Sequence, residues 1–127
     1  MTYGFGKTTS YSFSQAVERV TEELKKEGFG ILTTIDVQET LKKKLNVDFK
    51  KYVILGACNP PFAHQALGID EQIGLLLPCN VIVYEKDGST AVSAFDPMTM
   101  THMLGHDAIA PVAREVEARL RRVIAAV

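Results

Sequence analysis

The dipeptide Asp87-Gly88 separates two apolar-rich segments, residues 79–86 and 90–95, and this feature constrains the fold most directly. Asp-Gly is favoured in two-residue hairpin turns, because both central residues of a type I′ turn have positive φ. The two segments therefore predict neighbouring antiparallel strands. A third strand is predicted over residues 52–58, an apolar run that two consecutive prolines end because proline donates no backbone hydrogen bond.

Two amphipathic helices are predicted near the ends of the chain. Ser12 and Gln15 form a capping-box pattern before an apolar stripe at helical spacing, and Gly28 is expected to end this first helix. Asp107 is expected to cap a long C-terminal helix. Its apolar stripe consists of Ile109, Val112, Ala113, Val116, Leu120, Val123 and Ile124.

Two more strands are predicted over residues 2–10 and 29–35, which are rich in β-branched and aromatic residues. Short helices are expected at residues 37–45 and after the two prolines that end the third strand. Residues 73–86 indicate a strand that Pro78 disturbs, with its regular part from the next residue onward. The sequence thus predicts an α+β fold of about five strands in the order β-α-β-β-β-β-α, short helices aside.

The length and charge of the chain bound its organisation and its partners. At 127 residues we expect one domain, residues 1–127, whose folding buries roughly two thirds of the unfolded surface. Fifteen acidic and 14 basic residues give a net charge of -1, so we expect no nucleic-acid partner. The apolar runs are far shorter than the ~20 residues of a membrane-spanning helix, so we expect no membrane insertion.

The first residues of the chain lack the basic start and apolar block of a secretory signal, so we expect a cytoplasmic protein. In that reducing location Cys58 and Cys79 are expected to be thiols. A local basic cluster is formed by Lys42, Lys43, Lys44, Lys50 and Lys51. We interpret this cluster as a solvated face, with contact to an anion or a partner as the alternative.

Strand pairing decides whether the polar residues of the chain meet. Suppose that the strands at 52–58, 79–86 and 90–95 are antiparallel neighbours. The C-terminal end of the first then lies beside the start of the second and near the C-terminal end of the third. We call this edge the sheet rim. The candidate ligand-binding residues at the rim are Cys58, Asn59, Cys79, Asn80, Asp96 and His64.

Three interpretations of the two cysteines remain open. They are small buried hydrophobic residues, or a thiol site for redox or sulfur chemistry in which one thiolate attacks and the other resolves, or ligands of a soft metal. The candidate ligands for copper or zinc are Cys58, Cys79, His102 and His106. No recognised catalytic motif is present, so no catalytic residue and no cofactor are predicted.

The segments LGACNPPFAHQAL and GLLLPCNVIVYEKDG, followed by FDP, resemble the prokaryotic family called domain of unknown function 302. The resemblance extends over nearly the whole chain. It implies a curved, largely antiparallel sheet packed by an N-terminal and a long C-terminal helix, of the type grouped with TATA-box-binding-protein-like folds. It also implies a homodimer, and the family has no established activity.

The leading hypothesis from the sequence is a cytoplasmic, homodimeric binding module. It would hold a small ligand or a partner protein at the sheet rim near Cys58 and Cys79, without catalysis. The alternatives are a thiol-dependent redox or sulfur-handling protein and a binder of copper or zinc.

Overall fold

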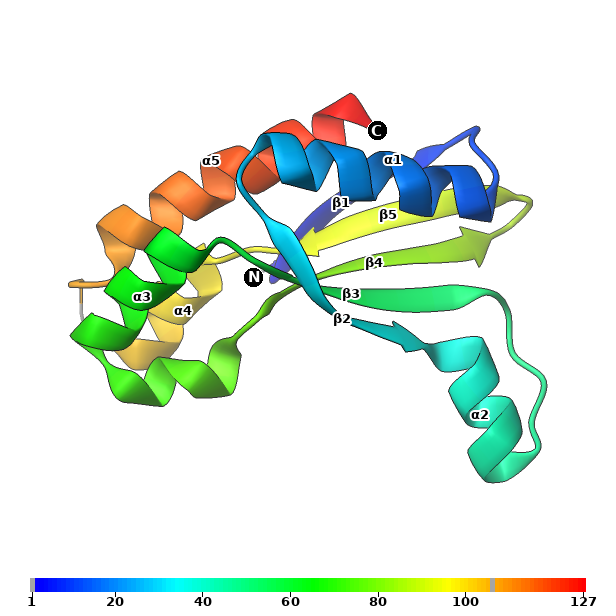
Figure 1. Ribbon diagram of the computed structural model, residues 1–127, viewed down its shortest axis with the longest axis horizontal. Coiled ribbons are helices and arrows are strands. Elements are labelled where there is room, and N and C mark those ends of the chain that lie inside the picture. The colour runs from blue at the N-terminus through cyan, green and yellow to red at the C-terminus, as the bar shows by residue number, and fades with distance from the viewer. Residues whose placement is uncertain (1, 106) are drawn as a thin grey trace.

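Five antiparallel strands form one sheet in the order β1-β5-β4-β3-β2 (Figure 1). The computed structural model describes residues 2–105 and 107–127. The strands are β1 (Gly4–Thr9), β2 (Gly30–Asp36), β3 (Tyr52–Cys58), β4 (Cys79–Lys86) and β5 (Ser89–Phe95). The helices are α1 (Phe13–Lys26), α2 (Val37–Leu45), α3 (Pro60–Ile69), the 3₁₀ helix η1 (Glu71–Leu76), α4 (Met98–Leu104) and α5 (Ala110–Ala126). The predicted α+β fold is confirmed.

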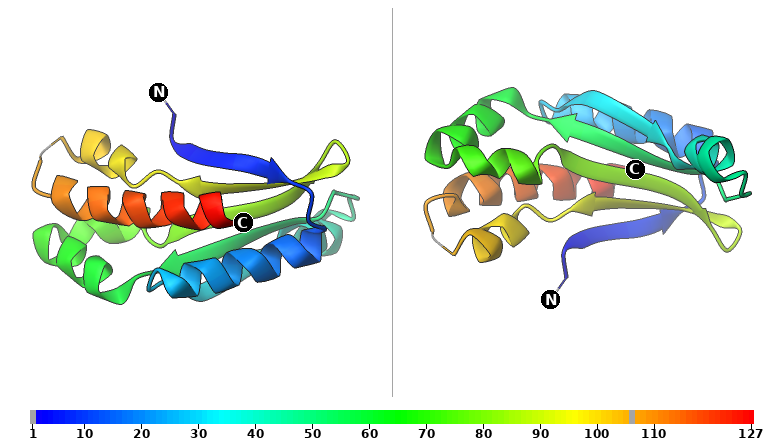
Figure 2. Two further views of the ribbon diagram at one scale, coloured as in Figure 1. Left: turned by 90° about the horizontal axis from the view of Figure 1, so that it is seen from above. Right: turned by 90° about the horizontal axis from the view of Figure 1, so that it is seen from below.

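The main core lies between one face of the sheet and the helices α1 and α5 (Figure 1). Alternate strand residues such as Leu55, Val81 and Val92 point into it and meet Leu24 and Leu120 of the helices, all of them fully buried. Burying each of these side chains contributes about 1.5–3 kcal/mol. Seen from below in Figure 2, no helix within the described residues lies over the middle of the opposite face.

Local sequence signals set the ends of α1 and of the β4–β5 hairpin. The Gln15 amide donates to Ser12 Oγ over 3.2 Å, and the Ser12 amide donates to Gln15 Oε1 over 3.1 Å, so the predicted capping box is present. In the hairpin turn Asp87 and Gly88 have φ values of 48° and 81°. Both values agree with a type I′ turn, the reason for which the hairpin was predicted.

A second, smaller apolar cluster joins α3, η1, α4 and the start of α5. It corrects the prediction for residues 73–76, which form part of the 3₁₀ helix η1 instead of a strand. Ile73 is fully buried in this cluster, and the Asp70 carboxylate accepts from the Gln72 amide and caps the turn. Residues 98–104 form α4, whose first amide, that of Met98, donates to Asp96 Oδ1 over 2.9 Å.

The predicted cap of the C-terminal helix is wrong. Ile109 occupies the cap position of α5, and no side chain caps the helix there. Asp107 lies two residues before this cap position. Its backbone oxygen accepts from the Ala110 amide over 3.0 Å in a turn. Pro111 lies in the first turn of α5, where a missing amide hydrogen costs no intrahelical bond.

The C-terminal end of α1 is joined to α5 by polar contacts. Arg119 Nη1 donates to the backbone oxygen of Glu27 over 3.0 Å, and Arg122 Nη2 lies 2.8 Å from the Glu27 carboxylate. The hydrogen bond from Arg122 is the main cause that lowers the pKa of Glu27. These contacts join the C-terminal end of α1 to the second half of α5.

No helix in the part of the chain that the structure describes is both long and apolar enough to cross a bilayer.

Candidate functional site

The end of β3 and the start of β4 meet at the sheet rim, with Ala57 paired to Cys79. Cys58 and Cys79 form no disulfide, and both line one cavity of about 30 Å³. The rest of the lining is almost wholly apolar, with Phe29, Ala57, Phe62, Ala63, Ala66, Met100, Val112, Ala113 and Val116 beside Asn59. A cavity of this size holds one or two water molecules. An organic ligand would need a rearrangement of the core to enter.

The environment of Cys79 disfavours thiol chemistry. Burial, with a smaller contribution from the neighbouring Cys58, raises the pKa of the Cys79 thiol to about 11. The thiolate is the nucleophilic form of cysteine, and an apolar environment disfavours it. At neutral pH only about one Cys79 thiol in 10⁴ is therefore ionised.

The other residues predicted for the sheet rim are spread over different environments. Asn59 is buried, and its Nδ2 donates to the backbone oxygen of Glu27 over 3.1 Å, so it ties β3 to the end of α1. Asn80 is exposed and lies on the sheet face opposite to Cys79, because successive strand residues alternate in direction. Asp96 Oδ1 accepts from the Met98 amide at the start of α4, and His64 is exposed on α3. Their role in ligand binding stays a prediction.

A metal site is not apparent at the predicted positions. Among the described residues, no group of three or more histidine, cysteine or acidic side chains is arranged to hold a metal ion. His102 is exposed on α4, and His106 lies outside the described residues. In the part of the chain that the structure describes, the copper or zinc interpretation therefore has no ligand set to support it.

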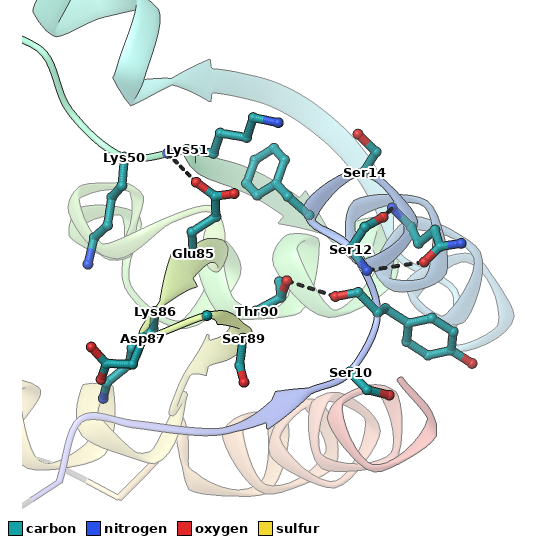
Figure 3. Close-up of a pocket in the computed structure, with 14 residues that line it drawn as sticks. Ser10, Ser12, Ser14, Lys50, Lys51, Glu85, Lys86, Asp87, Ser89 and Thr90 are labelled. Atoms are coloured by element: carbon teal, nitrogen blue, oxygen red, sulfur yellow. Dashed lines mark hydrogen bonds between the residues drawn. The ribbon is translucent and has the colours of Figure 1, made fainter.

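A much larger cleft lies at the opposite end of the sheet, where three connections meet (Figure 3). They are the β1–α1 loop, the segment before β3 and the β4–β5 hairpin. The cleft has a volume of about 1130 Å³. Its polar lining residues are Ser10, Ser12, Ser14, Gln15, Lys50, Lys51, Glu85, Lys86, Asp87, Ser89 and Thr90.

Hydrogen bonds fix the walls of this polar cleft (Figure 3). Thr90 Oγ1 donates to the backbone oxygen of Tyr11 over 2.8 Å, which ties the hairpin to the loop before α1. The Lys51 amide donates to Glu85 Oε1 over 3.4 Å. The side chains of Lys86 and Ser14, which line the cleft, make no hydrogen bond or ion pair with the described residues, so the Lys86 ammonium group and the Ser14 hydroxyl are available to a ligand.

The sequence analysis identified only part of the polar cleft. Lys50 and Lys51 belong to the basic cluster, for which contact to an anion was the alternative interpretation. The serines at alternate positions 10, 12 and 14 were missed. Ser12 had a structural explanation as a helix cap, and no spacing rule links this segment with a hairpin some 75 residues further along the chain.

Comparisons with known proteins identify the family. The model of the family described as domain of unknown function DUF302 matches residues 5–127, so the chain belongs to this family. The chain is also similar to the crystal structure of an uncharacterized conserved DUF302 protein from Bacillus stearothermophilus. The two are 32% identical, with a TM-score of 0.92 over 98% of each chain. A comparison with curated proteins gives no match.

These findings confirm the resemblance seen in the sequence and agree with the observed fold. The grouping with TATA-box-binding-protein-like folds stays a prediction. Because the family is described as one of unknown function, a function for this chain has to be argued from its own surface.

Proposed function

We propose that this protein is a non-catalytic binding module that holds a small, negatively charged ligand in the polar cleft. The observation that carries the proposal is the size and lining of the cleft. Pockets for small molecules usually have volumes of about 300–1000 Å³, and the cleft has about 1130 Å³. The cavity lined by Cys58 and Cys79 has a volume of only about 30 Å³, which is about a tenth of the smallest usual pocket for a small molecule.

The charges in the cleft favour an anion. Lys50, Lys51 and Lys86 line it against the two carboxylates of Glu85 and Asp87. The cleft also contains the N-terminal turn of α1, where the first amides of a helix lack intrahelical partners and carry a partial positive charge. Serine hydroxyls on both sides add hydrogen-bond donors for phosphate or carboxylate oxygens.

Thiol chemistry at the sheet rim has less support than binding in the cleft. It requires a reactive thiolate, and the raised pKa of Cys79 opposes its formation. A reducing, cytoplasmic location, in which both cysteines would stay thiols, is part of this proposal.

Inorganic phosphate is the probe that tests this function. At about 10 mM, and with a dissociation constant near 1 mM, phosphate should raise the unfolding temperature by roughly 5 °C over chloride at equal ionic strength. Replacing Lys86 with alanine should abolish most of this increase, because the substitution removes an unpaired cation from the cleft. Differential scanning fluorimetry measures both effects.

The matched control is Lys25→Ala, since Lys25 is exposed near the other end of α1 and does not line the cleft. This variant should respond to phosphate as the parent protein does. Equal responses of the parent and the Lys86→Ala variant would contradict the proposal, as would no stabilisation of the parent by phosphate.

A further inference from the structure

Helix α2 projects away from the sheet at one end of the molecule (Figure 1). None of its residues is buried, although it is only nine residues long and a helix of that length is marginal without packing. Packing within the chain therefore covers no residue of this helix fully.

Contacts hold the segment that follows α2 in place. Asn46 ends the helix with a φ of 55°, and its amide donates to the backbone oxygen of Lys42 over 3.0 Å. Gln38 Nε2 donates to the backbone oxygen of Phe49 over 2.9 Å. Lys42 forms an ion pair with Asp48 over 3.1 Å. The segment thus folds back along the helix.

Three large apolar side chains are exposed where α2 ends. Leu45 is 68% exposed, Val47 46% and Phe49 41%. Single exposed apolar residues are ordinary, but a group of them on one projecting segment indicates an interaction site.

Lysines surround this apolar group. Residues 37–51 contain five lysines against two acidic residues, Glu39 and Asp48, so this segment has a net charge of +3. The whole chain has a net charge of -1, so the other residues together carry -4. An anionic surface therefore attracts the α2 end of the molecule and repels the rest. The side chains of Lys43 and Lys44 make no hydrogen bond or ion pair with the described residues, so both are free to contact such a surface.

We propose that the end of α2 binds the surface of a bilayer that contains anionic lipids. The binding surface, called the α2 tip, consists of Lys42, Lys43, Lys44, Leu45, Val47 and Phe49. The three apolar side chains enter the boundary between headgroups and acyl chains, and the lysines contact the lipid phosphates. Binding at this depth needs no membrane-spanning helix. It is independent of the ligand proposed for the polar cleft.

The form of the α2 tip favours a bilayer over an acidic protein. A stable protein interface takes about 20–30 residues from each partner, whereas the α2 tip has six and projects from the molecule (Figure 1). A fluid bilayer surface adapts to a projecting group and needs no complementary shape. Leucine and phenylalanine beside lysines are also typical of segments that lie in the membrane interface, where lysine stems cover apolar surface and their ammonium groups stay in water.

Co-sedimentation of the full chain with lipid vesicles tests this proposal. Vesicles of phosphatidylcholine with about 30% phosphatidylglycerol should bind the protein roughly 100-fold more tightly than pure phosphatidylcholine vesicles, because each of three net charges contributes about fivefold near an anionic surface. Raising the NaCl concentration from about 0.1 M to about 0.5 M should weaken this binding at least about tenfold, since salt screens exposed charges.

Two variants separate the contribution of charge from that of apolar contact. Lys43→Gln combined with Lys44→Gln should weaken binding to the anionic vesicles about 25-fold, about fivefold for each lysine. Leu45→Gln should weaken it at least about tenfold, because the leucine side chain no longer leaves water on binding. All three side chains are exposed, so both variants should keep the circular dichroism spectrum of the parent.

Each variant has a matched control. Lys25→Gln combined with Lys26→Gln removes the same charge from exposed positions on α1. Leu75→Gln changes a leucine that is 81% exposed on η1, at the end of the molecule opposite α2 (Figure 2). Both controls should bind anionic vesicles as the parent does.

Three results would overturn the proposal. The first is a parent protein that binds neither kind of vesicle, or both kinds equally. The second is binding to anionic vesicles that Leu45→Gln leaves unchanged. The third is equally tight binding of soluble polyglutamate, because an acidic protein would then serve as well as a bilayer.

Discussion

Cys79 should react with a disulfide reagent about 100-fold more slowly in the folded protein at pH 7.4 than in the unfolded chain. Its pKa rises from 9.0 to about 11, chiefly because of burial, and each pKa unit reduces the thiolate fraction about tenfold. The Cys58→Ala variant isolates this thiol. Its reaction with Ellman's reagent, followed at 412 nm, should accelerate up to about pH 11 and in urea.

The same variant provides the reference, because its unfolded chain contains the same thiol without the burial. A reaction of folded Cys79 that is complete within seconds at pH 7.4 would contradict this account. It would also favour thiol chemistry at the sheet rim over the proposed binding function, since an accessible thiolate is what that chemistry requires.

Gly56→Ala should lower the free energy of unfolding by about 1–3 kcal/mol, the usual cost of adding a methyl group to a filled site. A Cβ atom at position 56 would collide with Thr33 Oγ1 and would lie 2.9 Å from Pro78 Cγ. Urea denaturation measures the change. Thr33→Ala in the same chain removes one of the two obstacles and should restore part of the loss.

Gly30→Ala is the matched control, because Gly30 also lies in a strand and no atom stands within 4 Å of the position of its added Cβ. This variant should change the free energy of unfolding by less than about 0.5 kcal/mol. Equal stability of the Gly56→Ala and Gly30→Ala variants would show that the close approach of β2 and Pro78 to β3 is not present in solution.

Most of the fold was predictable because its signals are local. The capping box at Ser12 needs only residues within one helical turn, and the Asp87-Gly88 turn fixes the pairing of β4 with β5. The errors occur where tertiary contacts decide. Ile73 is apolar in a run that suits a strand, but its burial against α3 and α4 favours the 3₁₀ helix η1.

The sheet rim illustrates what strand pairing alone can predict. Antiparallel pairing brought the end of β3 to the start of β4, as expected. The size of the space between them depends on how Phe62, Met100 and Val112 fill it, and those residues come from three separate helices. Sequence patterns give the neighbours of a cysteine in a strand, but not the volume around it.

The polar cleft could not be predicted for a different reason. Its walls come from segments around residues 10–15, 50–51 and 85–90, and no motif connects them. Each of these segments has an ordinary structural explanation, as a helix cap, a solvated lysine pair or a hairpin turn. Only the folded arrangement shows that the three lie around one space.

Titration of the ¹⁵N-labelled protein with inorganic phosphate, followed by NMR, tests the central claim most directly, because it reports where an anion binds. The account predicts that the largest shifts occur at the amides of Phe13, Ser14 and Lys86, around the polar cleft. The amide signals of Cys58 and Cys79 should not shift. Shifts centred on the two cysteines, or no shifts at millimolar phosphate, would contradict it.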